Sequence, residues 1–321
     1  MILTLTPNPS IDRTIALAGE LTRGQVQRVA SVTAQGGGKG VNISRASVAA
    51  GIPTVAVLPA AKDDPFVIEL LTAGIDCKPV LPAGGVRTNL TITEPDGTTT
   101  KLNSPGATVA RQHLDAMTST LLARAATSDW TVLAGSLADG TPDDFYADLV
   151  RRLLDCPSKV AVDTSGRPLA ALVDALPASA PDLMKPNGEE LASFTGADAD
   201  TLESDPAATA AAARTLIDRG VGAVLATLGA GGAVLVTADG AWHATPPPTT
   251  VVSTVGAGDS SLFGYILGDI RGLTPPERLA LAVAYGSAAA ALPGTTIPGP
   301  DDVRPALVAV RQLDLIAREL T

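Results

Sequence analysis

Residues 41–58, VNISRASVAAGIPTVAVL, join a helical pattern to a short apolar strand, as in one repeating unit of an α/β fold. The helical pattern covers residues 41–50, and the strand covers residues 54–58. Another apolar strand, residues 1–6 (MILTLT), comes before them. Strands that alternate with helices usually pair in parallel, with the helices on the faces of the sheet. The sequence therefore predicts a parallel central sheet.

The same alternation continues along the chain. Further parallel strands are predicted at residues 131–134, 159–162 and 224–227. Further helices are predicted at residues 112–126, 143–154, 206–219 and 276–291. With 321 residues, of which 45% are hydrophobic, the chain has enough apolar material to cover both faces of such a sheet.

Four strand-like segments do not fit this alternation. They are residues 11–17, 26–33, 87–94 and 98–102. Threonine and charged residues interleave along them, which is typical of an antiparallel sheet with one solvated face. Asp96-Gly97 suits a type I′ hairpin turn between the last two segments. We predict a small lid built from two insertions, at about residues 11–34 and 86–104, within a single domain that spans residues 1–321.

The overall charge limits the classes of ligand. The formal net charge is −10, from 23 Lys+Arg and 33 Asp+Glu, and a field of this sign repels nucleic acids and acidic membrane surfaces. Aromatic residues make up only 3% of the chain, too few for the platforms that stack single-stranded nucleic acid. An anionic ligand would therefore be held by a few local cations and by backbone N–H groups.

The ends and the cysteines suggest a cytoplasmic protein. The N-terminus lacks the basic start and long apolar stretch of a signal peptide, and no run approaches the roughly 18 apolar residues of a membrane span. Cys77 and Cys156 fit neither a disulfide framework nor a metal cluster, and we expect buried, inert thiols.

The strongest local motif is STVGAGD at residues 253–259, which leads into the helical pattern SSLFGYILGDI. The small residues Gly256, Ala257 and Gly258 allow the backbone to approach a ligand closely. The unpaired N–H groups of the helix start would form an anion hole for a transferring phosphoryl group. The carboxylate of Asp259 would either accept a proton from an attacking hydroxyl or simply cap the helix.

A second glycine-rich motif, QGGGKGVN at residues 35–42, also opens a helix. It is not a Walker A loop, because Lys39 is followed by Gly40, and it is not the dinucleotide fingerprint G-x-G-x-x-G. It offers a backbone cradle with one cation, Lys39, and one amide, Asn42, which suits a polyol phosphate. The alternative is a flexible loop.

Two further motifs each have a structural alternative. In KPNGEE (185–190), Asn187 and Glu190 have the spacing of a helix capping box, or they could organise Mg²⁺ through its waters. The run TLGAGG (227–232) is either an ordinary hairpin or a surface for a nucleotide. His113 and His243 have no neighbouring catalytic partner in the sequence, and we expect surface or satisfied polar residues.

In this order the motifs resemble those of ribokinase-like sugar kinases, in particular the phosphofructokinase-B branch. The matching segments are 6–12 (TPNPSID), 36–42, 135–137, 163–166 (DTSG), 185–190, 227–232 and 253–261. The start TPNPSIDRT and residues 100–106 (TKLNSPG) are most similar to bacterial 1-phosphofructokinases. The resemblance covers essentially the whole chain, and it implies a ribokinase-like three-layer α/β domain with a mostly parallel central sheet and a small antiparallel β lid.

The resemblance also implies a role for each matching residue. The catalytic set would be Asp259 as the base, with Gly256, Ala257 and Gly258 as the anion hole. Sugar hydroxyls would be held by Asp12, Gly38 and Asn42, and the sugar phosphate by Lys39, Arg87 and Ser136. ATP would be bound by Lys185, Asn187, Thr227, Gly229 and Gly231, with Mg²⁺ held through water at Asn187 and Glu190.

The implied reaction is phosphoryl transfer from ATP to the 6-hydroxyl of fructose 1-phosphate, in a homodimer whose lids pack together.

The sequence departs from the pattern of the resembled family at two positions. Ser253 replaces an aspartate associated with a monovalent-cation site, so a potassium requirement is not implied, and Ser104 replaces a glutamate common in 1-phosphofructokinases. The alternatives are a tagatose-6-phosphate or fructose-6-phosphate kinase and a non-catalytic ATP-binding sensor. A nicotinamide-dependent oxidoreductase is disfavoured, because its fingerprint is missing.

Overall fold

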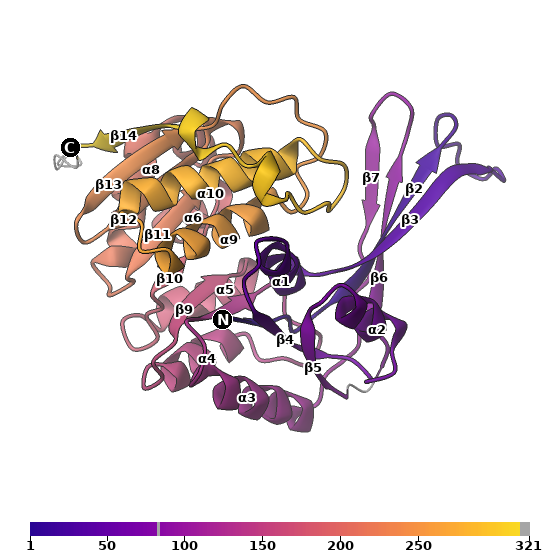
Figure 1. Cartoon of the computed structure of the whole chain (residues 1–321), viewed down its shortest axis with the longest axis horizontal. Helices are drawn as coiled ribbons and strands as arrows, with labels where there is room; N and C mark the ends of the chain where they lie inside the picture. The colour runs from indigo at the N-terminus through magenta and orange to yellow at the C-terminus, as the bar shows by residue number, and fades with distance from the viewer. Residues whose placement is uncertain (82–83, 315–321) are drawn as a thin grey trace.

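Short apolar strands form one ten-stranded sheet in the order β14-β13-β12-β11-β10-β9-β8-β1-β4-β5 (Figure 1). The computed structural model describes residues 1–81 and 84–314. The strands are β1 (Ile2–Leu5), β4 (Thr54–Pro59), β5 (Asp76–Val80), β8 (Trp130–Ala134), β9 (Lys159–Asp163), β10 (Leu183–Met184), β11 (Ala223–Thr227), β12 (Ala233–Thr237), β13 (Gly240–Thr245) and β14 (Ala309–Leu313). From β5 to β11 all neighbours are parallel, and only β12, β13 and β14 run antiparallel to theirs. The prediction of a mostly parallel sheet is confirmed.

Helices cover both faces of this sheet, because its central strands are apolar on both sides. In β4, Val55 and Val57 face one core while Ala56 and Leu58 face another. The helices are α1 (Lys39–Ala49), α2 (Pro65–Thr72), α3 (Arg111–Ala125), α4 (Phe145–Leu153), α5 (Gly166–Asp174), α6 (Gly188–Thr195), α7 (Ala199–Ser204), α8 (Pro206–Ile217), α9 (Ala257–Ile270) and α10 (Pro275–Ala290). Side chains of α3 to α8 belong to the core on the first face. On the second face, side chains of α1, α9 and α10 form one core, and those of α1 and α2 form another beside β4. The result is a three-layer α/β arrangement.

A separate four-stranded sheet projects from this body (Figure 1). Its strands are β2 (Ser10–Leu17), β3 (Val29–Gly37), β6 (Arg87–Thr93) and β7 (Thr99–Leu102), in the order β3-β2-β6-β7. Both hairpins, β2–β3 and β6–β7, are antiparallel as predicted, but they meet through a parallel pair, β2–β6. We call this sheet the lid.

The turn between β6 and β7 differs from the prediction of a type I′ hairpin. That turn needs positive φ at both central residues, whereas of its residues only Gly97 has positive φ, 92°. The Gly97 amide donates to the Glu94 carbonyl, and the Glu94 amide donates to the Thr98 carbonyl. Pro95, whose ring fixes a negative φ, instead starts a three-residue connection that ends at Gly97.

The parallel strands bring several loops to one end of the sheet. The segments that leave β1, β8, β9, β10 and β11 all begin at the carboxyl edge, where open α/β sheets commonly bind their ligands. The lid begins at Ser10, shortly after β1 ends at Leu5. The lid and the loops at the carboxyl edge of the sheet therefore border the same region.

Candidate active site

Asp259 lies in the first turn of helix α9, which begins directly after the glycine turn. Gly256 takes the N-cap position in a left-handed conformation (φ 80°), and no side chain caps the helix. The alternative that Asp259 merely caps α9 is therefore wrong. Its side chain is buried, with a residue exposure of 7%, and its Oδ2 accepts a hydrogen bond from Nδ2 of Asn42 at 2.7 Å.

The surroundings of Asp259 favour the protonated carboxyl more than water does. Burial is the largest cause and the negative charge of Asp163 adds to it, so that the pKa of Asp259 rises to about 6. Lys39, the hydrogen bond from Asn42 and Lys185 act in the opposite direction and limit the rise. A carboxylate that titrates close to neutral pH can accept a proton in one step of a reaction and release it afterwards.

Asp163, at the end of β9, joins the two lysines. Its side chain has no exposed surface; Oδ1 lies 2.7 Å from Nζ of Lys39, and Oδ2 lies 3.4 Å from Nζ of Lys185. Burial alone would raise the pKa of Asp163, but Lys185 and Lys39 outweigh it and the net shift is downward. Burial likewise disfavours charge on Lys39, yet Asp163 and Asp259 raise its pKa overall. Asp163 and Lys39 are thus both ionised at neutral pH.

Together these residues form a lysine–aspartate cluster, which we define as Lys39, Asn42, Asp163, Lys185 and Asp259. Asp163 is the member to which sequence analysis gave no role. It stands in DTSG, and the available signal was an acidic residue directly at the carboxyl end of a buried strand. Its partners could not be read from the sequence, because Lys39 lies 124 positions away.

Close contacts and backbone conformation favour glycine beside the cluster. A Cβ on Gly258 would lie 3.3 Å from Nζ of Lys185, so this ammonium group sits against the glycine turn. Gly38 has a φ of 115°, and a Cβ on Gly40 would lie 2.4 Å from Oγ1 of Thr6. In place of a flexible loop, the structure has α1 starting at Lys39 and packed against the end of β1.

The lid contributes Asp12 from β2. Its Oδ1 accepts hydrogen bonds from Nδ2 of Asn89 at 3.0 Å and from Oγ of Ser10 at 2.7 Å. A Cβ on Gly37 would lie only 2.1 Å from Oδ2 of Asp12, so the carboxylate covers the glycine backbone. The lid carboxylate and the start of the Lys39 segment are therefore in direct contact.

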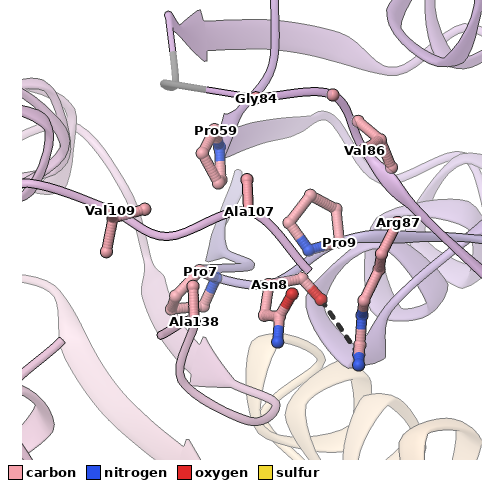
Figure 2. A pocket seen from close by; sticks show the side chains of 11 residues that line it. Pro7, Asn8, Pro9, Pro59, Gly84, Val86, Arg87, Ala107, Val109 and Ala138 are labelled. Carbon is pink, nitrogen blue, oxygen red and sulfur yellow. Dashed lines mark hydrogen bonds between the residues drawn. The ribbon is translucent and has the colours of Figure 1, made fainter. Parts of the chain in front are cut away.

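Arg87 and Ser136 lie on either side of Asn8 at the base of the lid. The guanidinium group of Arg87 donates to the carbonyls of Asn8 and Ser104, at 3.2 and 3.0 Å, and Figure 2 shows it turned toward the Asn8 carbonyl. Nδ2 of Asn8 lies 3.5 Å from Oγ of Ser136. The adjacent cavity in Figure 2 measures about 10 Å³, no more than one water occupies, and is too small for a sugar phosphate.

Asn187 and Glu190 form the predicted capping box at the start of α6. The Glu190 amide donates to Oδ1 of Asn187 at 2.7 Å, and the Asn187 amide donates to Oε2 of Glu190 at 2.9 Å. Each side chain keeps further oxygen lone pairs, which is the donor chemistry of a Mg²⁺ ion held through water. In residues 1–81 and 84–314, no three His, Cys, Asp or Glu side chains gather into a metal cage. Asn187 and Glu190 thus fit a Mg²⁺ ion that is held through water molecules.

The TLGAGG run lies beside this capping box. The Thr227 amide donates to the Pro186 carbonyl at 3.0 Å, and Thr227 forms a parallel bridge with Asn187. Gly229 and Gly231 form a short 3₁₀ helix, η1 (Gly229–Gly231), that connects β11 to β12. The hairpin interpretation is confirmed, and its turn borders the KPNGEE motif.

The histidines and cysteines lie outside the cluster, but they match the expectations only in part: Nδ1 of the buried His243 has no hydrogen-bond partner among the described residues, and Cys156 is only half-buried. Nδ1 of His113 accepts from the Ala110 amide at 3.1 Å, and Nε2 of His243 lies 2.9 Å from the Gly231 carbonyl oxygen. Cys77 is buried, which raises the pKa of its thiol to about 11, and Cys156 is a half-buried free thiol. Among the described residues, no helix has the length and apolar character needed to cross a bilayer.

The chain is similar to known proteins in both sequence and fold. The chain is 37% identical over 305 residues to a 1-phosphofructokinase from Rhodobacter capsulatus, covering 94% of this chain and 93% of the relative. It superposes on phosphofructokinase-2 from Escherichia coli, solved with substrates and products, with a TM-score of 0.85 and 27% identity over 94% of this chain and 96% of that one. Ribokinase from Arabidopsis thaliana, at 19% identity, shares the fold with a TM-score of 0.70 over 91% and 93% of the two chains. Since residues 5–302 match the model of the pfkB family carbohydrate kinases, the chain belongs to that family.

Proposed function

We propose that this carbohydrate kinase transfers the γ-phosphoryl group of ATP to the 6-hydroxyl of fructose 1-phosphate, with Asp259 as the general base. The observation that carries the proposal is a buried carboxylate of raised pKa in the first turn of α9, beside two lysines. The choice of sugar is supported by the relatives named 1-phosphofructokinase.

In the proposed reaction, Asp259 takes the proton of the attacking hydroxyl as the oxygen approaches the γ-phosphorus. The backbone of Gly256, Ala257 and Gly258 stabilises charge on the transferring group, as in other anion holes. Lys185 lies against that turn and adds a fixed positive charge. Closure of the lid over the sugar would exclude water that could otherwise hydrolyse ATP.

We assign the sugar phosphate to groups at the base of the lid. Asp12, Gly38 and Asn42 would hold sugar hydroxyls; Asn42 donates to Asp259 and keeps its carbonyl oxygen free to accept. Lys39, Arg87 and Ser136 would meet the phosphate. The ammonium group of Lys39 donates one of its three hydrogens to Asp163, so the others remain available to bind the phosphate.

We assign ATP to the other side of the cluster, at Lys185, Asn187, Thr227, Gly229 and Gly231. Mg²⁺, organised by Asn187 and Glu190 through water, would neutralise charge on the phosphate oxygens.

Exposed apolar side chains on the lid, Val29, Val32 and Leu102, support a homodimer in which two lids pack together. We also propose that the protein is cytoplasmic and that residues 1–321 form one kinase domain.

A coupled assay of ADP release across three acceptors tests the substrate. We expect the highest kcat/KM with fructose 1-phosphate, compared with fructose 6-phosphate and tagatose 6-phosphate. The second candidate, a 6-phosphate kinase, is favoured by the similarity to phosphofructokinase-2 from Escherichia coli solved in complex with fructose-6-phosphate, at 25% identity. It would be indicated by a higher kcat/KM for either 6-phosphate. Absence of ADP release with every acceptor would instead indicate an ATP-binding sensor.

Activity should also fall on the acid side of neutrality. The base must be ionised to accept a proton, so kcat/KM for the sugar phosphate is expected to decline as pH falls through about 6, the pKa of Asp259. The limiting slope would be about tenfold per pH unit for one proton. Because the substrate phosphate itself titrates near pH ~6, its binding should be measured by calorimetry over the same range. A flat profile between pH 7.5 and 5 would contradict the assignment.

A further inference from the structure

At one point on its outer edge, the base of the lid is held by side chains of the body. β3 is an edge strand of the lid sheet, and Gly36 lies near its end, just before α1. The Gly36 amide donates to Oε2 of Glu69 at 3.1 Å. Its carbonyl accepts from Nε and Nη2 of Arg45, at 3.1 and 3.0 Å. Both backbone groups of Gly36 are thus satisfied by an ion pair.

The two side chains also bind each other and come from the body of the protein. Arg45 lies on α1 and Glu69 on α2, and Nη2 of Arg45 is 2.7 Å from both carboxylate oxygens of Glu69. The Arg45 side chain is only 10% exposed. Hydrogen bonds to charged groups are stronger than neutral ones, and a partly buried guanidinium group loses less to solvent screening. The ion pair therefore ties the edge of the lid to two helices of the body.

The close approach depends on glycine at this position. A Cβ on Gly36 would lie 2.5 Å from Oε2 of Glu69 and 2.9 Å from the ring of Phe66. With any larger residue, the Glu69 carboxylate, the Phe66 ring or the strand would have to shift. We define Gly36, Arg45 and Glu69 as the lid latch.

The latch stands directly beside groups assigned to substrate. The next residue, Gly37, lies under the carboxylate of Asp12. Lys39 follows two residues later, and Asn42, which donates to Asp259, lies one turn before Arg45 on α1. A shift of Gly36 would therefore move the lid carboxylate relative to the lysine–aspartate cluster.

We propose that Arg45 and Glu69 are positioning residues that fix the pivot of the lid, and thereby the placement of Asp12 against the body of the active site. Neither residue has to touch the substrate. The kinetic part of this inference rests on the proposed sugar-phosphate kinase function, whereas the mechanical part does not.

Arg45→Met is expected to weaken use of the sugar phosphate selectively. Because small misplacements of substrate-positioning groups are costly, kcat/KM for the sugar phosphate should fall by about 10- to 100-fold, mainly through KM. The KM for ATP should stay within about twofold, since the proposed nucleotide groups lie on other elements. Arg45→Lys keeps the charge without the planar fork and should restore only part of the loss.

Hydrogen exchange tests the pivot without any substrate. In the full-length protein, the amides of residues 34–40 should exchange about tenfold faster in Arg45→Met than in the unmodified chain, because the local opening becomes easier. Arg214→Met is a matched control: Arg214 on α8 also donates to a carboxylate, Asp218, and to a carbonyl, that of Thr237. The control should leave both the exchange of residues 34–40 and the kinetics unchanged.

If Arg45→Met does not fold, Glu69→Gln carries the same test, because it keeps the size of the side chain and removes the charge. Unchanged exchange at residues 34–40 in the folded variant would overturn the proposal, as would faster exchange with unchanged KM for the sugar phosphate. If the unmodified enzyme phosphorylates no sugar phosphate, the proposed function fails, while the exchange result still decides whether the latch holds the lid.

Discussion

Replacing Asp259 with asparagine is expected to lower kcat by about 10²–10⁴-fold, the contribution typical of a general base. The amide has nearly the same shape and can still hydrogen-bond with Asn42, so the fold and the binding of both substrates should be largely kept. What is lost is the ability to take the proton of the acceptor hydroxyl. Steady-state kinetics with both substrates varied would show the loss in kcat, with little change in either KM.

A matched control exists at the opposite end of the same helix. Asp269 is also a buried carboxylate of α9; it accepts from Nε1 of Trp130 at 2.9 Å and pairs with Lys159 at 2.8 Å. Asp269→Asn should lower the thermal stability but leave kcat unchanged, because this carboxylate is remote from the glycine turn. A kcat for Asp259→Asn within a few-fold of the unmodified enzyme would remove Asp259 from the mechanism.

Asp163→Asn is expected to reduce both activity and stability. Removing one partner of a buried ion pair typically costs about 3–5 kcal/mol, since the remaining charge is left without compensation. Here Lys39 and Lys185 lose a common anchor. We expect kcat/KM to fall by about 10²-fold or more, because two positive charges near the transferring group would no longer be fixed.

The pH profile separates this role from a purely structural one. Asp163 contributes to the raised pKa of Asp259, and the freed lysines would lower that pKa further. The acid limb of kcat/KM should therefore move to lower pH in Asp163→Asn. Asp269→Asn, which loses stability through a different ion pair, should keep the acid limb in place. An Asp163→Asn enzyme that melts earlier but keeps its kcat/KM and acid limb would show that Asp163 only stabilises the fold.

Periodicity predicted the main sheet well where strands are long and apolar on both sides. The strand predicted at 159–162 is β9, and the one predicted at 224–227 lies within β11. β10 was missed because it has only two residues, and β5 because Pro79 interrupts its apolar pattern. Neither strand carries enough local signal; both are stabilised by pairing with neighbours already in the sheet.

The candidate site was predictable as a set of motifs but not as a geometry. Glycine turns and an acid at a helix start indicated where ligands could approach. The hydrogen bond between Asn42 and Asp259 joins residues 217 positions apart, and no local pattern specifies it. The parallel pairing of β2 with β6 was also hidden, because each hairpin is complete by itself and only tertiary packing selects the edge on which they meet.

The place of β1 in the sheet has a consequence for how the protein is made. β1 lies between β4 and β8, so during synthesis this strand waits for β8, which begins at Trp130, before both its edges are paired. Chains generally fold from the N-terminal part onward during translation. A nascent chain that ends before α9 contains Lys39, Asp163 and Lys185, but it lacks Asp259. On the proposed mechanism, the growing polypeptide acquires its phosphate-binding lysines before its proton acceptor.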